Sequence, residues 1–408
     1  MVGMPAVAML SMHTSPLLQP GTGDAGGMNV FVRELAASLA QAGVSVRVYV
    51  RRDGPDQPDV VTVEPGFEVR HVTAGDQSLP KERLGDVVDR FADVVGADVA
   101  ADGDVSAIHA NYWLSGVAGH RLKHELGLPL VSTFHTLGRV KSATGDREPH
   151  RRAEAEAAVS GCSDLITAAN SVEVTQLVDL YGANRERIEL VAPGVDRAFF
   201  SPGDRAGARR ALGLDGRPVV LFVGRLQPLK GATVAVEALA AMVRRDARLL
   251  LVGGPSGPGG PAELAALELA VERLGLSDRV VMVPPQPHHL LSTYYRAADA
   301  CVVPSRSESF GLVALEAAAC GIPVVASAVG GLTTLVRHGE SGFLVKDRNP
   351  VEFAARLDSL LGNAGLAEAM GRAGMEVARR YAWSSTAGRL RRIYADLARR
   401  PALVECGA

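Results

Sequence analysis

The sequence lacks the features that define several classes of protein, beginning with cysteine. Only four cysteines occur among 408 residues, and they are scattered without the spacing of a metal-binding motif. In a chain of this length such cysteines are typical of reduced thiols in a cytoplasmic protein. We therefore predict four free thiols. Their positions are Cys162, Cys301, Cys320 and Cys406.

An excess of charge of one sign is also absent. The chain has 43 Lys and Arg against 45 Asp and Glu, a formal net charge of −2. This balance gives no electrostatic footprint for nucleic acid, and no polybasic run predicts binding to a membrane surface. The first ten residues carry no charge, and their apolar run is too short for a signal peptide or a membrane span. We expect a cytoplasmic protein without a nucleic-acid or membrane partner. Its oligomeric state is open, with a homodimer as one possibility.

Two common nucleotide-binding motifs are missing. No G-x-x-x-x-G-K-[ST] occurs, and no G-x-G-x-x-G follows the first predicted strand. The first absence excludes a P-loop nucleotide triphosphatase, and the second argues against a nicotinamide-dependent dehydrogenase.

The sequence does contain two series of alternating strands and helices, which indicate an α/β fold. The length predicts two domains, and 47% hydrophobic residues suffice for two cores. The first series starts with a strand at Ala6–Ser11 and the second with a strand at Val219–Gly224. A Pro- and Gly-rich segment without periodicity, 192–204, is the predicted linker. We expect two doubly wound, Rossmann-like domains, 1–191 and 205–382, facing across a cleft. The C-terminal helix, 383–400, should pack back on the first domain.

The stretch from Pro304 to Gly321 is the most informative in the chain. It places Glu308 in a predicted strand-to-helix turn and Glu316 inside the following helix. Ligands of open α/β sheets bind at such turns. Eight helical residues rise about 12 Å, so two carboxylates this far apart cannot share a proton as an acid/base pair. They could instead hold two hydroxyl-bearing parts of one extended ligand, such as a sugar nucleotide. The alternative is two solvated glutamates.

Cations and glycines follow other predicted strands. Arg225 and Lys230 come after the strand at Val219–Gly224 and are candidates for a diphosphate clamp, with a solvated basic loop as the alternative. Glycine pairs at 26–27 and 330–331 could let backbone N–H groups approach an anion, or could be simple turns. His135 could be a general acid/base or only a hydrogen-bonded histidine that ends a strand.

These motifs resemble those of a known family, the retaining nucleotide-sugar glycosyltransferases of the GT-B fold. The resemblance rests on Glu308-x7-Glu316 together with the G-R-L-Q-P-L-K block that contains Arg225 and Lys230. Further stretches, S-M-H-T-S-P-L-L-Q-P-G-T-G-D-A-G-G-M-N, N-Y-W-L-S-G and F-H-T-L-G-R-V-K, resemble a subgroup of the mycothiol pathway. Members of that subgroup transfer N-acetylglucosamine from UDP-N-acetylglucosamine to 1D-myo-inositol 3-phosphate. The similarity runs over nearly the whole chain.

The resemblance implies a role for each matching residue. Catalytic groups would be Arg225 and Lys230 on the donor diphosphate, Glu308 on the transferred sugar, and His135 near that sugar. Donor contacts would also come from Gln19, Pro20, Gly27, Gln286 beside the uracil, and Glu316 on the ribose. The acceptor pocket would be formed by His13, Asp24, Asn29, Lys81, Tyr112, Thr136 and Arg152, with Lys81 and Arg152 on the phosphate.

The resemblance also implies a mechanism and bears on metal binding. The anomeric configuration would be retained, and the leaving diphosphate would accept the acceptor proton, so no carboxylate nucleophile is needed. Catalysis would rest on positioning and on charge stabilisation. Mg²⁺ is sometimes placed near the region of Tyr295, Arg296 and Ala298 and a nearby threonine. This chain has Ile322 where that threonine is usual, so we expect no required metal.

Two other functions remain open at this point. One is a sister glycosyltransferase with another nucleotide sugar and a different acceptor, such as a cyclitol, a thiol or an antibiotic precursor. The segment Lys141–Arg152, which is shorter than in several family members, keeps that reading open. The other is a non-catalytic protein that binds sugar nucleotides. The intact set of Arg225, Lys230, Glu308 and Glu316 argues against it.

Overall fold

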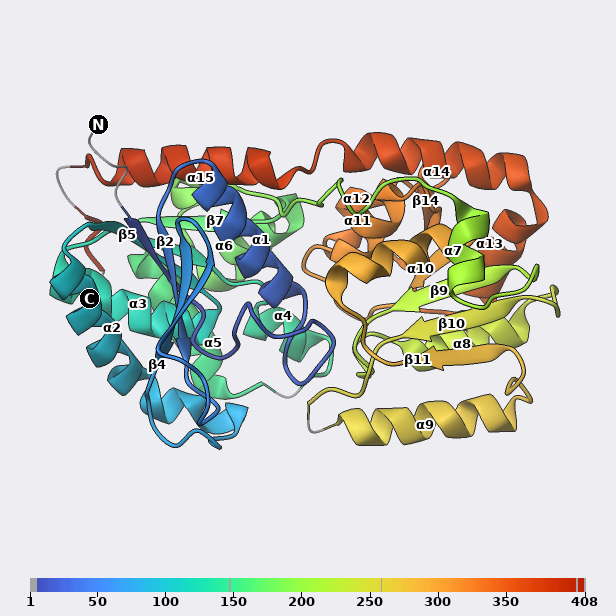
Figure 1. The fold of residues 1–408 in the computed structure, drawn as a ribbon, viewed down its shortest axis with the longest axis horizontal. Coiled ribbons are helices and arrows are strands. Elements are labelled where there is room, and N and C mark those ends of the chain that lie inside the picture. The colour runs from blue at the N-terminus through green and yellow to red at the C-terminus, as the bar shows by residue number, and fades with distance from the viewer. Residues whose placement is uncertain (1–5, 147, 258, 401–402, 407–408) are drawn as a thin grey trace. The chain divides into compact units, whose positions relative to one another are not determined.

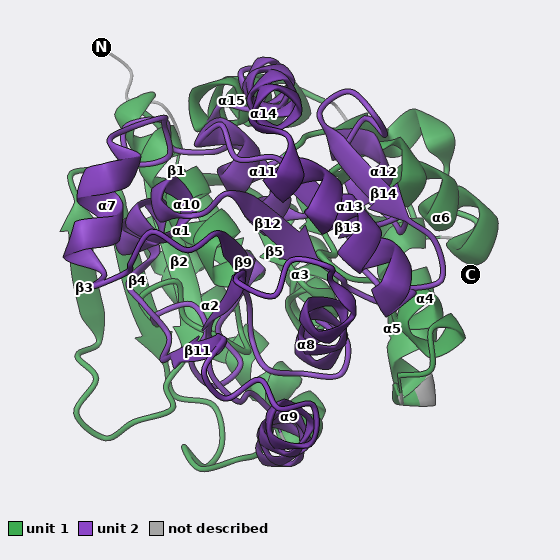
Figure 2. Ribbon diagram, turned by 90° about the vertical axis from the view of Figure 1, so that its right-hand side faces the viewer, with its two compact units in different colours: residues 1–18, 28–192, 383–408 green, residues 19–27, 193–382 purple. Residues whose placement is uncertain are grey.

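The computed structural model describes residues 6–146, 148–257, 259–400 and 403–406. The chain forms two compact units (Figure 2). The first comprises residues 1–18, 28–192 and 383–408, and the second comprises residues 19–27 and 193–382. Residues 1–5 of the N-terminal stretch analysed above lie outside the described part. Each unit is described by itself below.

The first unit is built on an eight-stranded sheet with the order β3-β4-β2-β1-β5-β6-β7-β8 (Figure 1). All neighbouring strands are parallel except β3 and β4, which are antiparallel. The strands are β1 (Ala6–Leu10), β2 (Val46–Arg51), β3 (Val60–Glu64), β4 (Phe67–Val72), β5 (Val105–Asn111), β6 (Leu130–Thr133), β7 (Leu165–Ala168) and β8 (Ile188–Leu190). The order reverses between β1 and β5, where such sheets bind ligands.

Helices cover both faces of this sheet. They are α1 (Gly27–Gln41), α2 (Val88–Asp102), α3 (Trp113–Leu126), α4 (Gly138–Ala143), α5 (His150–Cys162), α6 (Ser171–Tyr181) and α15 (Trp383–Leu397), with 3-10 turns at Lys81–Val87 and Arg185–Arg187. Along β1, Val7 and Met9 pack with α1 and α15, whereas Ala8 and Leu10 pack with α2 and α3. This alternation explains why β1 is apolar throughout, since both faces of the strand are buried. Helix α15 thus belongs to the core of the first unit.

The second unit is a six-stranded parallel sheet with the order β11-β10-β9-β12-β13-β14. The strands are β9 (Val219–Val223), β10 (Arg248–Val252), β11 (Val280–Val283), β12 (Ala300–Val303), β13 (Val324–Ser327) and β14 (Gly342–Val345). The helices are α7 (Arg205–Ala211), α8 (Ala232–Ala241), α9 (Gly260–Arg273), α10 (Leu291–Ala297), α11 (Leu312–Ala319), α12 (Leu332–Leu335), α13 (Pro350–Gly362) and α14 (Ala364–Ala378), with a 3-10 turn at His288–Leu290. The order reverses between β9 and β12. The predicted α/β class with two doubly wound sheets is confirmed.

The segment 19–27 packs with the second unit, although the sequence analysis assigned it to the first. The Nε2 atom of Gln19 donates to the Pro285 carbonyl oxygen at 2.9 Å, and the Ser256 hydroxyl donates to the Gly23 carbonyl oxygen. A loop with little apolar content gives no periodicity from which its packing partner could be predicted. The chain also crosses from one unit to the other between residues 192 and 193 and between residues 382 and 383.

The prediction of four free thiols is wrong for two of the cysteines. Cys162 and Cys406 form a disulfide across a sequence separation of 244 residues, whereas Cys301 and Cys320 are free and buried. Because α15 packs on the first unit, the chain after it can return to the end of α5, a proximity that linear spacing does not reveal. Among the described residues, no helix combines the length and apolar character needed to cross a membrane.

Candidate active site

The clearest polar cluster of the second unit lies at the carboxyl ends of β9 and β12. Lys230 follows β9, Glu308 follows β12, and the two strands are hydrogen-bonded neighbours. The Lys230 Nζ atom lies 2.7 Å from Glu308 Oε2, and the Ser305 hydroxyl donates to the same oxygen at 3.2 Å. Both charged side chains are partly exposed, with 24% and 18% of their surface accessible. The two residues predicted to hold the diphosphate and the sugar therefore form an accessible ion pair with each other.

Glycines let the loop that carries Glu308 pack tightly. A Cβ atom on Gly231 would lie 2.4 Å from the Pro304 carbonyl oxygen, and one on Gly330 would lie 2.0 Å from the Glu308 carbonyl oxygen. The Gly331 amide also donates to that Glu308 carbonyl at 2.9 Å. Gly231 and Gly330 have φ angles of +75° and +46°, which favour glycine. In this structure the 330–331 pair, predicted as an anion nest, holds the backbone of the glutamate loop.

Arg225 is held against the 19–27 segment. Its Nη1 atom donates to the Asp24 carbonyl oxygen at 3.3 Å and to the Ser256 hydroxyl at 3.4 Å. A Cβ atom on Gly26 would come within 3.2 Å of Arg225 Nε, whereas one on Gly27 would meet only Leu312 at 3.5 Å. Close packing against the guanidinium therefore requires glycine at 26 more than at 27.

Glu316 is buried, so the alternative of a solvated surface glutamate is wrong for this residue. Only 5% of it is exposed, on α11. Its Oε1 atom lies 2.7 Å from His288 Nε2, and its Oε2 atom accepts a hydrogen bond from the Tyr295 hydroxyl at 2.8 Å. Burial first, and then the carboxylate of Glu316, raise the pKa of Tyr295 well above its usual value, so this hydroxyl stays a donor. Each carboxylate oxygen keeps a second lone pair for a ligand hydroxyl.

The side chains of Tyr295, Arg296 and Ile322 do not suit Mg²⁺, which requires oxygen ligands. The Tyr295 hydroxyl is committed to Glu316, and Arg296 is a cation whose Nε donates to the Ser201 carbonyl oxygen at 2.8 Å. Ile322 is apolar and 4% exposed. We assign no metal role to these residues.

The candidate site of the first unit begins where β5 and β6 end. Tyr112 and His135 follow these neighbouring strands, and both have positive φ angles, +77° and +62°. Such angles are uncommon for residues other than glycine and cluster at functional sites. The Nε2 atom of His135 lies 2.9 Å from Asn111 Oδ1. The Asn111 Nδ2 atom is buried without a hydrogen-bond acceptor among the described residues.

His135 is poorly suited to proton transfer at neutral pH. Burial, and to a lesser extent the nearby His109, lower the pKa of His135 to about 3. An effective general acid or base has a pKa near the working pH. A neutral imidazole that donates from Nε2 to Asn111 favours the hydrogen-bonded histidine of the two alternatives, although it can still contact a sugar.

Two cations and a second imidazole surround the ring of Tyr112. The Arg152 guanidinium carbon lies 5.0 Å and the Lys81 Nζ atom 6.0 Å from the centre of this ring. The ring of His13 lies 4.2 Å from it, centre to centre. Both cation distances are within the range in which a phenol ring attracts a cation, and the His13 ring is in direct contact with the Tyr112 ring. Four residues predicted in the acceptor pocket are thus brought together.

Arg152 is more deeply engaged than the sequence indicated. It is 1% exposed, and its Nε and Nη1 atoms each lie 2.7 Å from a carboxylate oxygen, of Glu156 and Glu148 respectively. Its Nη2 atom donates to the Thr136 carbonyl at 2.8 Å and to the Thr136 hydroxyl at 3.0 Å. These bonds use four of the five guanidinium N–H groups. Burial alone would raise the pKa of Glu148, but Arg152 and Lys141 outweigh it, so the carboxyl stays ionised.

The structure places the remaining predicted acceptor and donor residues in three different segments. Asn29, 2% exposed, donates from Nδ2 to the Thr14 hydroxyl at 2.7 Å and to the Ser15 carbonyl at 2.6 Å, so it fixes the loop after β1. Asp24 lies in the segment that packs with the second unit, as do the predicted donor residues Gln19, Pro20 and Gly27. Gln286 follows β11, and its side chain donates to the Pro284 carbonyl at 2.9 Å.

Several residues of these clusters were missed by sequence reasoning. Glu148 and Glu156 precede and follow Arg152 at helical spacing, which is a signal for ion pairs that could have been used. Ser305, in the glutamate loop, and His288, after β11, have no comparable signal, because a single polar residue at a strand end is common. The contact of His288 with Glu316 depends on the order of strands in the sheet, whereas Ser305 contacts Glu308 within one loop.

Family models match both units. The model for the glycosyl transferase 4-like domain matches residues 26–194, and the model for glycosyl transferases group 1 matches residues 204–377. Curated relatives include a D-inositol 3-phosphate glycosyltransferase of Acidothermus cellulolyticus, 47% identical over 96% of this chain and 90% of the relative. Another of that name, from Nocardia farcinica, is 46% identical over 93% of this chain and 87% of the relative.

Solved structures give the same fold. The sucrose-phosphate synthase of Thermosynechococcus elongatus is 34% identical, with a TM-score of 0.91 over 96% of this chain and 99% of that one. WaaG, a glycosyltransferase of lipopolysaccharide biosynthesis, is 18% identical with a TM-score of 0.71 over 95% of this chain and 99% of that one. The second likeness concerns the fold alone.

Proposed function

The chain belongs to the group 1 glycosyltransferases of the GT-B fold, and from this premise we propose that it transfers N-acetylglucosamine from UDP-N-acetylglucosamine to 1D-myo-inositol 3-phosphate. This would be the first step of mycothiol biosynthesis. The observation that carries the choice of acceptor is the 47% identity to a D-inositol 3-phosphate glycosyltransferase over 96% of the chain. The cations around Tyr112 support it, because a phosphate monoester needs charged donors.

At the donor end, the ion pair of Lys230 and Glu308 would be exchanged for ligand contacts. The diphosphate would take the Lys230 ammonium, with Arg225 as its second cation. Glu308 would then be released to accept hydrogen bonds from hydroxyl groups of the transferred sugar. The pair is partly exposed, so breaking it costs only about 1 kcal/mol or less. Glu316 would accept from the ribose hydroxyls with the lone pairs that Tyr295 and His288 leave unused.

At the acceptor end, Arg152 would act mainly by placing Thr136. The Thr136 oxygen accepts from Arg152 Nη2, so the hydroxyl hydrogen points to another acceptor. A phosphate oxygen is a suitable one. Glu148 and Glu156 already compensate much of the Arg152 charge, so Lys81, whose Nζ atom lies 6.0 Å from the centre of the Tyr112 ring, would supply a further cation for the phosphate.

The mechanism we propose is retention of the anomeric configuration, with the leaving diphosphate as the base that accepts the proton of the acceptor hydroxyl. Lys230 and Arg225 would stabilise the negative charge that develops on the diphosphate. His135 would contact the sugar without transferring a proton, in keeping with its lowered pKa of about 3. Glu308 and Glu316 would bind and would not attack the anomeric carbon.

The experiment that tests this proposal is UDP release from UDP-N-acetylglucosamine with three acceptor conditions. We expect rapid release with 1D-myo-inositol 3-phosphate, and slow release with unphosphorylated myo-inositol or with no acceptor. Equal rates with the two inositols would reject the phosphate contact. Slow hydrolysis that no inositol stimulates would favour a sister enzyme with a different acceptor. Binding of UDP without any release would favour a binding protein.

A further inference from the structure

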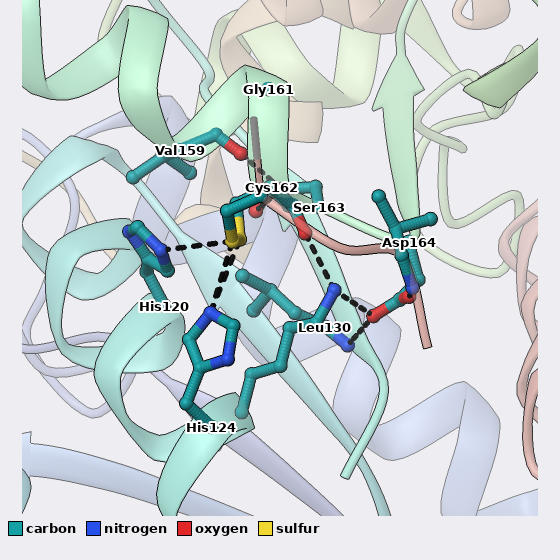
Figure 3. Close-up of a disulfide and its surroundings, with 12 residues drawn as sticks. His120, His124, Leu130, Val159, Gly161, Cys162, Ser163 and Asp164 are labelled. Atoms are coloured by element: carbon teal, nitrogen blue, oxygen red, sulfur yellow. Dashed lines mark hydrogen bonds and ion pairs between the residues drawn. A yellow bond between two sulfur atoms is a disulfide. The ribbon is translucent and has the colours of Figure 1, made fainter. Parts of the chain in front are cut away.

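A second cluster of reactive side chains lies in the first unit, among residues that the proposed acceptor pocket does not use. It consists of His120 and His124 on α3, Cys162 at the end of α5, and Cys406 in the C-terminal segment (Figure 3). One potential ligand atom from each of the four residues lies within 4.8 Å of the others. Helix α3 begins beside Tyr112, and a rise of about 1.5 Å per residue places His124 roughly 17 Å further along. The proposed reaction makes no use of these four residues.

The imidazoles and the sulfur atoms point toward one another. His120 and His124 are one helical turn apart and therefore share a face of α3. The Nε2 atom of His124 lies 3.3 Å from Cys162 Sγ and 3.0 Å from Cys406 Sγ. The Nε2 atom of His120 lies 3.3 Å from Cys406 Sγ. Figure 3 shows both rings directed at the sulfur pair.

Two imidazole nitrogens and two sulfurs are the ligand set of a structural zinc site. Zinc prefers a tetrahedron with Zn–S of about 2.3 Å and Zn–N of about 2.0 Å, in which neighbouring ligand atoms are ~3.3–3.8 Å apart. The three nitrogen–sulfur distances need changes of only a few tenths of an ångström to meet these values. The two sulfur atoms, bonded at about 2 Å in the disulfide, must separate to about 3.8 Å once it is reduced. We propose that, once the Cys162–Cys406 disulfide is reduced, His120, His124, Cys162 and Cys406 bind one Zn²⁺ ion.

The two states exclude each other because they use the same sulfur atoms. Reduction of the disulfide requires two electrons and two protons, which a dithiol supplies as it is oxidised to its own disulfide. The product is two thiols. Binding of Zn²⁺ then releases both thiol protons to solvent, since zinc ligates thiolates. The cluster therefore holds either a disulfide or a metal ion.

Buried polar contacts fix the backbone beside the cluster without using the sulfurs. Asp164 accepts from Leu130 N at 2.8 Å and from Val404 N at 2.7 Å. Its Oδ2 atom also lies 2.9 Å from Lys123 Nζ, and both side chains of this pair are at most 2% exposed. Lys123 Nζ also donates to the Cys162 carbonyl at 2.7 Å. Cys406 lies two residues after Val404, so it is held close to Cys162 in either state. A zinc ion would fasten the C-terminal segment to α3 and α5.

The test is a Co²⁺ titration of the full chain under two redox conditions. Co²⁺ replaces Zn²⁺ in such sites and reports thiolate ligands by charge-transfer absorption and tetrahedral geometry by visible d–d bands. We expect one Co²⁺ per reduced chain, displaced by Zn²⁺, and no binding by the disulfide form. Absence of these bands in the reduced protein, or their presence in the disulfide form, would overturn the proposal.

Matched variants identify the ligands. His124→Ala changes an exposed residue and should abolish the tetrahedral spectrum without unfolding the protein. Cys406→Ser should remove the thiolate bands of that site. The controls are His338→Ala and Cys320→Ala in the second unit, which should both keep one Co²⁺ per chain. A full spectrum in Cys406→Ser would contradict the assignment.

Discussion

The two units present their candidate sites in different ways. In the second unit, Lys230, Glu308 and Glu316 belong to two short stretches of sequence that follow adjacent strands. In the first unit, His13, Lys81, Tyr112 and Arg152 come from four separate elements and meet around one ring. The proposed donor site is therefore encoded locally and held by close backbone contacts. The proposed acceptor site depends on loops and charges that can vary independently, which is how one fold can serve several acceptors.

The largest effect on turnover is expected for Lys230→Ala. Loss of the cation that stabilises the leaving diphosphate should lower kcat by about 10²–10³-fold, with the fold intact because the residue is partly exposed. Steady-state kinetics and a thermal unfolding curve measure the two properties. The control is Lys346→Ala, an exposed lysine of the same unit, which should keep normal turnover. Near-normal turnover of Lys230→Ala would remove the diphosphate clamp.

Gly330→Ala should sharpen the claim that the donor site depends on close backbone contacts. The new methyl group would meet the Glu308 carbonyl oxygen, so we expect a raised donor KM and a lower free energy of unfolding. The matched control is Gly339→Ala, which also has a positive φ, +81°, but no atom within 4 Å of its Cβ position. Gly339→Ala has only the free-energy cost of placing alanine at a positive φ, about 1 kcal/mol. Any larger loss of stability in Gly330→Ala is therefore due to the steric clash. Equal effects of the two changes on donor KM would contradict the claim.

For the acceptor site, Lys81→Gln should raise the acceptor KM about 10-fold, the loss of one charged hydrogen bond, and leave the donor KM unchanged. Initial rates at varied 1D-myo-inositol 3-phosphate measure this. Unphosphorylated myo-inositol is the control substrate and should show no difference between variant and wild type. An unchanged KM for the phosphorylated acceptor would exclude Lys81 from phosphate binding.

Arg152→Ala should raise the acceptor KM far more than the donor KM, and it should also destabilise the fold. Removing this arginine leaves Glu148 and Glu156 without their buried cation, which costs about 3–5 kcal/mol. Urea unfolding and acceptor kinetics of the same preparation separate the two effects. A variant as stable as wild type would show that the buried ion pairs contribute little, and an unchanged acceptor KM would count against the phosphate contact.

The last effect concerns stability as a function of pH. The pKa of His135 is about 3 in the folded chain, below its ordinary value near 6.5, so between these values the unfolded chain binds more protons. Stability should therefore fall as pH falls from 6.5 toward 3, by roughly 2 kcal/mol at pH 5 for this residue. Urea unfolding at pH 7 and pH 5 measures this. His135→Asn, which tolerates the positive φ, should lessen the dependence; an unchanged dependence would contradict it.

Features that are encoded locally could be predicted from the sequence, whereas contacts between distant segments could not. The strands that alternate with helices, and the turn and helix positions of Glu308 and Glu316, follow from local periodicity. The pairing of Lys230 with Glu308 could not be read in this way, because it requires that β9 and β12 be neighbours. The spacing of Glu148 and Glu156 around Arg152 could have indicated their ion pairs, but the burial of Arg152 could not be predicted, because it is a property of tertiary packing. The Cys162–Cys406 pair was missed for the same reason, since only the return of α15 brings the two sulfurs together.

The most direct test of the central claim is the proton NMR spectrum of the product formed from UDP-N-acetylglucosamine and 1D-myo-inositol 3-phosphate. The account predicts one product, with N-acetylglucosamine joined to the phosphorylated inositol by an α-linkage, the configuration of the donor. A β-linked product would contradict retention and would require a base other than the leaving diphosphate. Free N-acetylglucosamine as the only sugar product would contradict the assigned acceptor.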